Sequence, residues 1–329
     1  VAPAGDPGFL AAMHGLVLGD AVPSDRVGAV ATPGGTGAVR QTLEMVRRLT
    51  PEATIWLSAP TWPNHTEITR YLGLNLREYR YYDAETGGLD RDGMMADLAG
   101  AKPGDVILVH ACCHNPTGVD LQPDDWRAVG KICQYTGAIP FVDAAYLGFG
   151  QGLEDDAAGL RVLTGLVPQM LLAVSCSKNF GVYRDRAGIA MAVTRDAGRA
   201  EAAGGLLAWL NRQNFTFPPD HGARAVQTVL GDADLKDLWR GELREMRENL
   251  QANRAAFAAE LRRITGSDRF GFLTAHQGMF SLLGATPDQV DRLRDEFGIY
   301  LVGDGRMNVA GLTPETIPVV ARAVAEVMR

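Results

Sequence analysis

Continuous apolar runs that alternate with segments of helical periodicity constrain this chain most strongly. Such runs occupy residues 54–57, 105–110, 138–142, 170–174 and 188–194. A strand that is apolar at every position, rather than at every second one, is typical of a parallel sheet covered on both faces. The alternation therefore predicts an α/β domain in three layers, with a mostly parallel central sheet between two layers of helices.

The C-terminal third follows a different pattern. Apolar residues recur at helical spacing from Leu235 to Ile264, which predicts one long helix leading out of the large domain. The elements predicted beyond it are strands at 270–273 and 279–283, a helix from Thr286 to Gly298, a hairpin of 299–302 with 306–310, and a last helix from Thr313. We expect a large domain over residues 1–245 and a smaller α+β domain over residues 246–329.

Composition excludes several classes of protein. A net charge of −7 and the lack of any basic run argue against a nucleic-acid surface, and no apolar stretch reaches the length of a membrane span. The four cysteines have no framework spacing, which favours reduced thiols in a cytoplasmic protein; they are Cys112, Cys113, Cys133 and Cys176.

One lysine stands out by position and by scarcity. The 32 basic residues include only four lysines, and one of them, Lys178, follows the apolar run 170–174 directly. If only a positive charge were needed, this arginine-rich chain would be expected to use arginine there. A desolvated lysine can form a Schiff base, whereas arginine is never deprotonated. An ordinary loop lysine is the simpler alternative, but the strand-end position favours a reactive amine.

Four further residues follow strand ends in the same way. Trp62 lies between two prolines, Asn115 lies in the turn HACCHNPTG with an expected cis bond before Pro116, and Asp143 and Tyr146 follow the run 138–142. Each has a structural alternative, such as a core tryptophan or an aspartate that caps a helix. Because ligands bind at the carboxyl edge of open α/β sheets, their coincidence there predicts a site.

A phosphate cradle is the next expected part of that site. The turn Gly34–Gly35–Thr36 leads into a helix, and free N–H groups with the helix dipole favour an anion. Ser175 and Arg186, on either side of Lys178, offer a hydroxyl and a guanidinium. A Schiff-base lysine beside a phosphate cradle indicates pyridoxal phosphate.

The sequence also offers candidate residues for the other groups that bind this cofactor. Asp143 would face the pyridine nitrogen, Tyr146 and Asn115 would bond to the ring oxygen, and Trp62 would stack on the ring. Arg306, in the smaller domain, would bind the α-carboxylate of an amino-acid substrate. A zinc hydrolase is a competing hypothesis because His110, Cys112, Cys113 and His114 are close in sequence, but their spacing is not that of separated ligand pairs, so no metal site is predicted.

Seven motifs together resemble one enzyme family. They are TPGGTGA, TWPNH, HACCHNPTG, FVDAAYLGF, SCSKNFGVYRDR, NRQNFTFPP and GDGRMNVAG, in family order and over nearly the whole chain. The chain resembles a fold-type I, class I aminotransferase of the aspartate and aromatic amino-acid family. The resemblance implies a reversible transfer of the amino group of an aromatic amino acid or aspartate to 2-oxoglutarate.

The resemblance also implies residue roles. Lys178 would be the Schiff-base lysine and the base at the substrate Cα, and Asp143, with His65 behind it, would pair with the pyridinium. The residues implied to bind the cofactor are Gly35, Thr36, Trp62, Asn115, Asp143, Tyr146, Ser175, Lys178 and Arg186. Those implied to bind the substrate are Trp62, Asn115, Arg212, Phe280 and Arg306. Arg212 would act in the neighbouring subunit's site, which implies a homodimer with shared active sites.

Two departures from the family pattern bear on these expectations. Family members carry a further segment ahead of the position of Val1, and this segment contributes part of the small domain. Its absence from the sequence could reflect removal or disorder, and we favour disorder. Phe217 is bulkier than the small polar residue expected in aspartate-specific members, which, with the segments GSDRFGF and FGIYLVGDGR, favours the aromatic branch. The alternatives are a strict aspartate aminotransferase, another pyridoxal-phosphate reaction such as a β-lyase, decarboxylase or racemase, and the effector-binding part of a transcription regulator.

Overall fold

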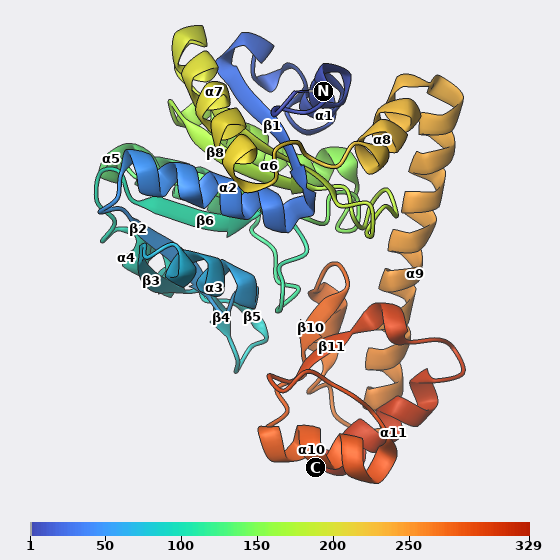
Figure 1. The fold of residues 1–329 in the computed structure, drawn as a ribbon. Coiled ribbons are helices and arrows are strands. Elements are labelled where there is room, and N and C mark those ends of the chain that lie inside the picture. Colours follow the sequence, from blue (N-terminus) through green and yellow to red (C-terminus); the bar gives the residue numbers. More distant parts are fainter. Residues whose placement is uncertain (1) are drawn as a thin grey trace.

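A seven-stranded sheet forms the centre of the computed structural model, which describes residues 2–329 (Figure 1). Val1, where the further family segment would join, lies outside the described residues. Strand β9 is antiparallel to both of its neighbours and the other strand pairs are parallel, so the predicted mostly parallel sheet is confirmed. In spatial order the strands are β1 (Val27–Pro33), β9 (Ala187–Val193), β8 (Met170–Ser175), β7 (Ile139–Ala144), β6 (Val106–His110), β2 (Thr54–Ala59) and β3 (Asn75–Arg80).

Helices cover both faces of this sheet. The helices are α1 (Pro7–Val17), α2 (Gly34–Leu49), α3 (Pro63–Tyr71), α4 (Arg91–Leu98), α5 (Pro123–Thr136), α6 (Leu153–Leu166), α7 (Ala197–Asn214) and α8 (His221–Gly231). Helices α2, α3 and α7 pack on one face, and α1, α5, α6 and α8 on the other, with a separate hydrophobic cluster beneath each layer. The three-layer α/β architecture predicted from the sequence is confirmed.

Local sequence explains why these elements form where they do. Strand β6 is buried at all five positions, as expected for a strand between two layers of helices. Helix α5 begins with Pro123 and a capping box in which Asp125 accepts from the Gln122 N–H, and it ends at Gly137 in the left-handed conformation. The loop 111–122, which connects β6 to α5, therefore lies at the carboxyl edge of the sheet.

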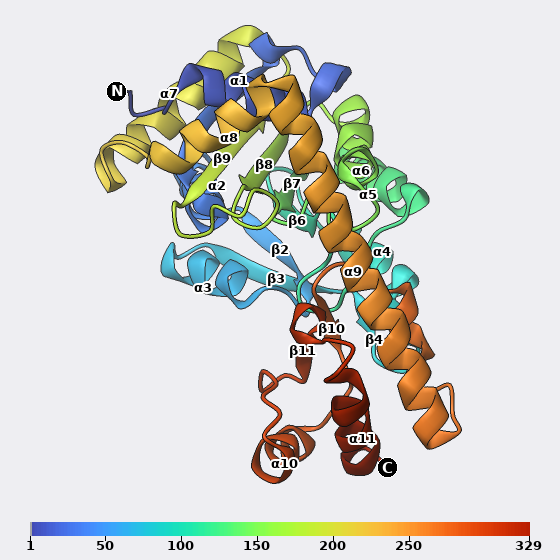
Figure 2. The same cartoon turned by 90° about the vertical axis from the view of Figure 1, so that its right-hand side faces the viewer.

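Helix α9 (Ala233–Thr265) joins the sheet to the C-terminal elements (Figure 2). Its first part contacts α8 and its later part packs along α11. The remaining elements are β4 (Tyr82–Asp83) with β5 (Gly88–Leu89), β10 (Phe280–Leu282), α10 (Pro287–Phe297), β11 (Arg306–Asn308) and α11 (Ile317–Val327). The long helix predicted over 235–264 and the capping box of Thr286 with Gln289 are confirmed.

Two predictions in the C-terminal part are wrong. Residues 270–273 do not form a strand; Gly271–Ala275 is a 3₁₀ turn, in which the buried Phe270 and Leu273 are one turn apart. Residues 299–302 do not pair with 306–310 as a hairpin. Arg306–Asn308 pairs instead with Phe280–Leu282, because that ladder buries Ser281 against Met307, whereas Tyr300 in the expected strand is 81% exposed.

Within residues 2–329, no helix combines the length and the apolar character needed to cross a membrane.

Candidate active site

The carboxyl ends of four neighbouring strands meet at one cavity of about 390 Å³. Lys178, Asn115 and Trp62 lie in the loops that follow β8, β6 and β2. Asp143 is the penultimate residue of β7, and Tyr146 lies two residues beyond the end of that strand. The cavity is lined by every predicted site residue except His65 and Arg212: Gly35, Thr36, Trp62, Asn115, Asp143, Tyr146, Ser175, Lys178, Arg186, Phe280 and Arg306. The parallel order of the strands explains this convergence of residues that are far apart in sequence.

Lys178 lies half-buried in the cavity, with Nζ 4.7 Å from the centre of the Tyr146 ring. Burial lowers the pKa of Lys178, the charge of Arg186 lowers it further, and Asp143 opposes them. A lowered pKa increases the fraction of free amine at neutral pH, which is what a nucleophilic or basic lysine requires.

The Lys178 loop is fixed by helix α9. The indole Nε1 of Trp239 donates to the Asn179 carbonyl at 2.6 Å, and its ring stacks on Phe180 at 4.3 Å between centroids. Trp239 is buried, so both contacts are protected from water. The amine therefore projects from a loop whose backbone has little freedom.

Asp143 is a buried carboxylate held by His65. The Nε2 of His65 lies 2.8 Å from Asp143 Oδ2, and its Nδ1 lies 2.9 Å from Thr61 Oγ1. Burial alone would raise the pKa of Asp143, but the hydrogen bond from His65 and the charges of His65, His110 and Lys178 outweigh it and hold that pKa below its ordinary value. Asp143 is therefore an anion at neutral pH, able to stabilise a positive group in the cavity.

The first turn of α2 and Arg186 form an anion cradle. No side chain caps the N-terminus of α2, so its first N–H groups have no partner within the helix or from a cap. A Cβ added to Gly35 would lie 2.9 Å from the Cβ of Ser175, so only glycine lets this turn approach the end of β8 so closely. Arg186 is anchored by its Nη1, which donates to the Tyr183 carbonyl at 2.9 Å. These groups suit a phosphate.

Arg306 faces the same cavity from β11. Its Nη1 donates to Asn115 Oδ1 at 2.8 Å, and its guanidinium carbon lies 4.9 Å from the centre of the Phe280 ring. The Nε of Arg306 is buried without a hydrogen-bond partner among residues 2–329. A buried, unpaired donor is costly unless a ligand satisfies it, which fits a carboxylate. Phe280 also meets Tyr146 edge to face, with 6.2 Å between ring centres.

Arg212 is not brought to this cavity. It is exposed on α7, and its guanidinium lies 5.4 Å from the ring centre of Phe217. A role for Arg212 in this chain's own cavity is therefore not supported by its position.

Several lining residues were not predicted as site residues. They are His110, Cys112, Ala145, Ser177, Tyr183 and Met279. His110 is the last residue of β6 and Cys112 lies two residues beyond it, so the strand-end rule that identified Asn115 would also have found them. The histidines of the hypothetical zinc cluster instead stack on each other at 4.1 Å, and His114 Nε2 lies 2.9 Å from Ser58 Oγ. Across residues 2–329, no group of three or more potential ligands is arranged to hold a metal ion.

Comparison with known proteins identifies the class of protein that this fold and cavity define. The family model for aminotransferase class I and II matches residues 3–324, so the chain belongs to this family. The aromatic-amino-acid aminotransferase of Paracoccus denitrificans is 52% identical over 98% of this chain and 82% of its own length. The aspartate aminotransferase of Salmonella typhi is 40% identical over 98% of this chain and 83% of its own length.

A solved relative extends the comparison to structure. The aromatic-amino-acid aminotransferase of Burkholderia pseudomallei, covalently bound to pyridoxal phosphate, matches with a TM-score of 0.97 at 38% identity, covering 100% of this chain and 83% of that one. The protein is therefore a pyridoxal-phosphate-dependent aminotransferase, and its substrates are amino acids and 2-oxo acids. The groups described above fit this cofactor, because an amine with a lowered pKa, a buried carboxylate and an anion cradle line one cavity.

Proposed function

We propose that this aminotransferase moves the amino group of an aromatic amino acid, and also of aspartate, to 2-oxoglutarate, with preference for the aromatic substrate. The observation that carries this proposal is the pairing of Arg306 with Phe280 in one cavity, since a carboxylate can bind to the buried donor while an aromatic side chain packs on the ring. The 52% identity to an aromatic-amino-acid aminotransferase supports the same substrate class.

The residues that line the cavity support an assignment of roles toward the cofactor. Gly35, Thr36, Ser175 and Arg186 would hold the phosphate, Asp143 the ring nitrogen, and Trp62 one face of the ring. Asn115 and Tyr146 would donate to the ring oxygen. When bound, pyridoxal phosphate supplies an aldehyde that condenses with amines and a protonated ring that takes up the electron pair released at the substrate Cα.

The chain's own groups would carry the remaining work. Lys178 Nζ would hold the cofactor in the resting enzyme and, once displaced, remove and return the proton at Cα. Asp143, kept anionic by His65, would hold the proton on the ring nitrogen. Arg306 and Asn115 would orient the α-carboxylate, so that the Cα proton points toward Lys178.

Substrate preference tests the proposal directly. With 2-oxoglutarate as acceptor, we expect kcat/KM for phenylalanine or tyrosine to exceed that for aspartate about tenfold, because Phe280 contributes apolar surface to the cavity. The measurement is formation of the matching 2-oxo acid under steady-state conditions, with alanine as a control amino acid that lacks both side-chain types. A preference for aspartate would instead support a strict aspartate aminotransferase.

A homodimer with shared sites belongs to the same proposal, because Arg212 lies away from the cavity of its own chain. Mixing Lys178→Ala with Arg212→Leu subunits after mild dissociation should restore about a quarter of wild-type turnover with aspartate, since each mixed dimer then holds one intact site. The measurement is activity before and after subunit exchange. If Arg212 served its own chain, the mixture would stay as inactive as its components.

Two further parts of the proposal concern organisation. The boundary between a large domain, residues 1–245, and a small domain, residues 246–329, would fall inside α9, whose first part contacts α8 and whose later part packs on α11. A cytoplasmic location is supported by the four free cysteines of residues 2–329, which suit a reducing compartment.

A further inference from the structure

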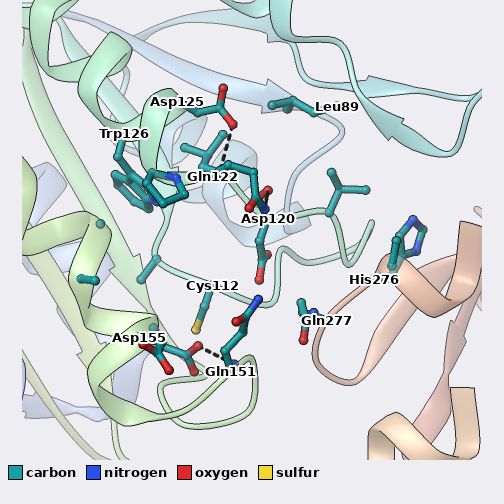
Figure 3. Close-up of a pocket in the computed structure, with 18 of the residues that line it drawn as sticks. Leu89, Cys112, Asp120, Gln122, Asp125, Trp126, Gln151, Asp155, His276 and Gln277 are labelled. Carbon is teal, nitrogen blue, oxygen red and sulfur yellow. Dashed lines mark hydrogen bonds between the residues drawn. The ribbon is translucent and has the colours of Figure 1, made fainter.

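The segment from His276 to Phe280 separates two cavities. Met279 and Phe280 line the active-site cavity. His276 and Gln277 line a second cavity of about 540 Å³, which Figure 3 shows together with other lining residues such as Cys112 and Asp120. Because this dividing segment has open space on both sides, close packing alone does not determine its position.

Contacts at the ends of the dividing segment hold it only in part. The Gln277 N–H donates to the Gly118 carbonyl at 2.7 Å, and the Val309 N–H donates to the Met279 carbonyl at 2.7 Å. Gly118 has φ +75°, and a Cβ on it would lie 2.4 Å from the Phe280 carbonyl oxygen. The first contact joins the segment to the loop that follows β6, and the second joins it to the turn Val309–Gly311, whereas the carbonyls of Gln277, Gly278 and Phe280 face α9.

Arg254, on α9, supplies the contacts on that side. Its Nη2 donates to the carbonyls of Gly278 at 2.8 Å, Phe280 at 2.7 Å and Gln277 at 3.3 Å, and its Nη1 donates to Ser281 Oγ. One guanidinium thus bonds to three residues of the segment and to Ser281, which follows it. No other side chain of residues 2–329 bonds to so many carbonyls of this segment.

The burial of Arg254 makes these bonds unusual. The residue is 3% exposed and forms no ion pair with a carboxylate among residues 2–329. Burial lowers the pKa of Arg254 to about 10, which still leaves it charged at neutral pH. Burying a cation without a carboxylate partner costs free energy, and the hydrogen bonds to backbone carbonyls are the main compensation for Arg254. Breaking one of these bonds would leave both the guanidinium N–H and the carbonyl oxygen without a partner.

We propose that Arg254 is a positioning residue for the substrate pocket, which fixes the backbone of Phe280 and thereby the ring on which the substrate side chain packs. Through the strand pairing of Phe280 with Asn308 and of Leu282 with Arg306, the same contacts set the position of Arg306 across the cavity. This inference rests on the proposed role of Phe280 and Arg306 in substrate binding.

The first test uses the holoenzyme with Arg254→Lys. A lysine keeps the charge but cannot reach four acceptors at once, so we expect KM for phenylalanine to rise about tenfold while kcat changes less than about twofold. The dissociation constant of 3-phenylpropionate, an unreactive carboxylate probe followed by the absorbance of the bound cofactor, should rise by the same factor. Arg247→Lys is the matched control, because Arg247 is also on α9 and donates to a backbone carbonyl, that of Gly148, outside the segment.

A double-mutant cycle separates positioning from general stability. In a Phe280→Leu background, Arg254→Lys should raise the dissociation constant of the probe less than about twofold, because the residue through which it acts is already changed. A further tenfold rise in that background, or a lowered melting temperature with unchanged probe binding in the single variant, would overturn the inference. If Arg254→Lys fails to fold, Ser281→Ala, which removes one acceptor, should raise the dissociation constant about threefold; unchanged binding in that variant counts against the inference.

These outcomes are distinct from failure of the proposed function. If the wild-type holoenzyme prefers aspartate, the substrate proposal fails, and binding of 3-phenylpropionate to wild type and variants still measures the effect of Arg254. If the wild-type enzyme prefers aromatic amino acids but the probe binds the Arg254→Lys variant as tightly as wild type, only the positioning role of Arg254 fails.

Discussion

Replacing Lys178 with alanine should lower kcat by at least about 10⁴-fold, because the substitution removes both the amine that holds the cofactor and the base at the substrate Cα. No other lysine lines the cavity within residues 2–329. The measurement is a single turnover with phenylalanine and excess pyridoxal phosphate, followed by quantification of phenylpyruvate. Borohydride reduction of the wild-type holoenzyme, followed by peptide mass spectrometry, should place the cofactor on Lys178.

Lys178→Arg is the informative control for that result. It restores a positive charge in the half-buried position and leaves the nearby charges of Asp143 and Arg186 in place. Because a guanidinium does not deprotonate at accessible pH, we expect it to be as inactive as alanine. Turnover of either variant within about tenfold of wild type would contradict the role given to Lys178.

Asp143→Asn should reduce the rate of the first half-reaction about 10³-fold. The pKa of Asp143 is held below its ordinary value chiefly by the hydrogen bond and charge of His65 against the effect of burial, so the wild-type group is an anion throughout the neutral range. Asparagine has the same shape but no charge, and it cannot hold a proton on the ring nitrogen by electrostatic attraction. Stopped-flow absorbance of the bound cofactor after addition of phenylalanine measures the effect.

His65→Gln separates the charge of Asp143 from its orientation. The glutamine can still donate to Asp143 Oδ2 but lacks the ring nitrogen that contacts Thr61, so Asp143 keeps its charge while its partner is held less firmly, and we expect a loss of only about tenfold. If Asp143→Asn and His65→Gln lowered the rate equally, orientation rather than charge would be the important contribution. If the Asp143→Asn enzyme were as fast as wild type, neither the charge nor the orientation of Asp143 would contribute to the reaction.

Sequence reasoning was most successful where one physical rule acts on many positions. The carboxyl ends of neighbouring parallel strands must lie at the same edge of a sheet, so Trp62, Asn115, Asp143 and Lys178 could be predicted to converge without any knowledge of contacts between them. The cis bond before Pro116 was also expected from its turn. The strand-end rule gives no distances, however, and the His65 contact to Asp143 came from family resemblance and not from spacing.

Sequence patterns do not predict the pairing of short strands whose partners are distant in sequence. The three residues of β11 could pair with the neighbouring run 299–302 or with Phe280–Leu282, and local propensity does not distinguish these choices. The outcome depends on which pairing buries Ser281 and Met307, which is a property of the assembled C-terminal part. Arg254 was not singled out for the same reason: in sequence it is one of several arginines on an amphipathic helix, and only the fold shows that it faces backbone carbonyls instead of water.

Helix α9 contacts two separate parts of the cavity wall. It bonds to the Lys178 loop through Trp239 and to the Phe280 segment through Arg254, and these two side chains are separated along the helix by about four turns, or roughly 22 Å. The helix therefore connects the loop of Lys178 to the segment of Phe280, two parts of the cavity wall that are far apart in sequence. A tilt of about 5° about Trp239 would displace Arg254, and with it the backbone of Phe280, by about 2 Å relative to the Lys178 loop. A substitution that softened α9 between these two side chains would change the fit of the substrate without altering any residue that touches it.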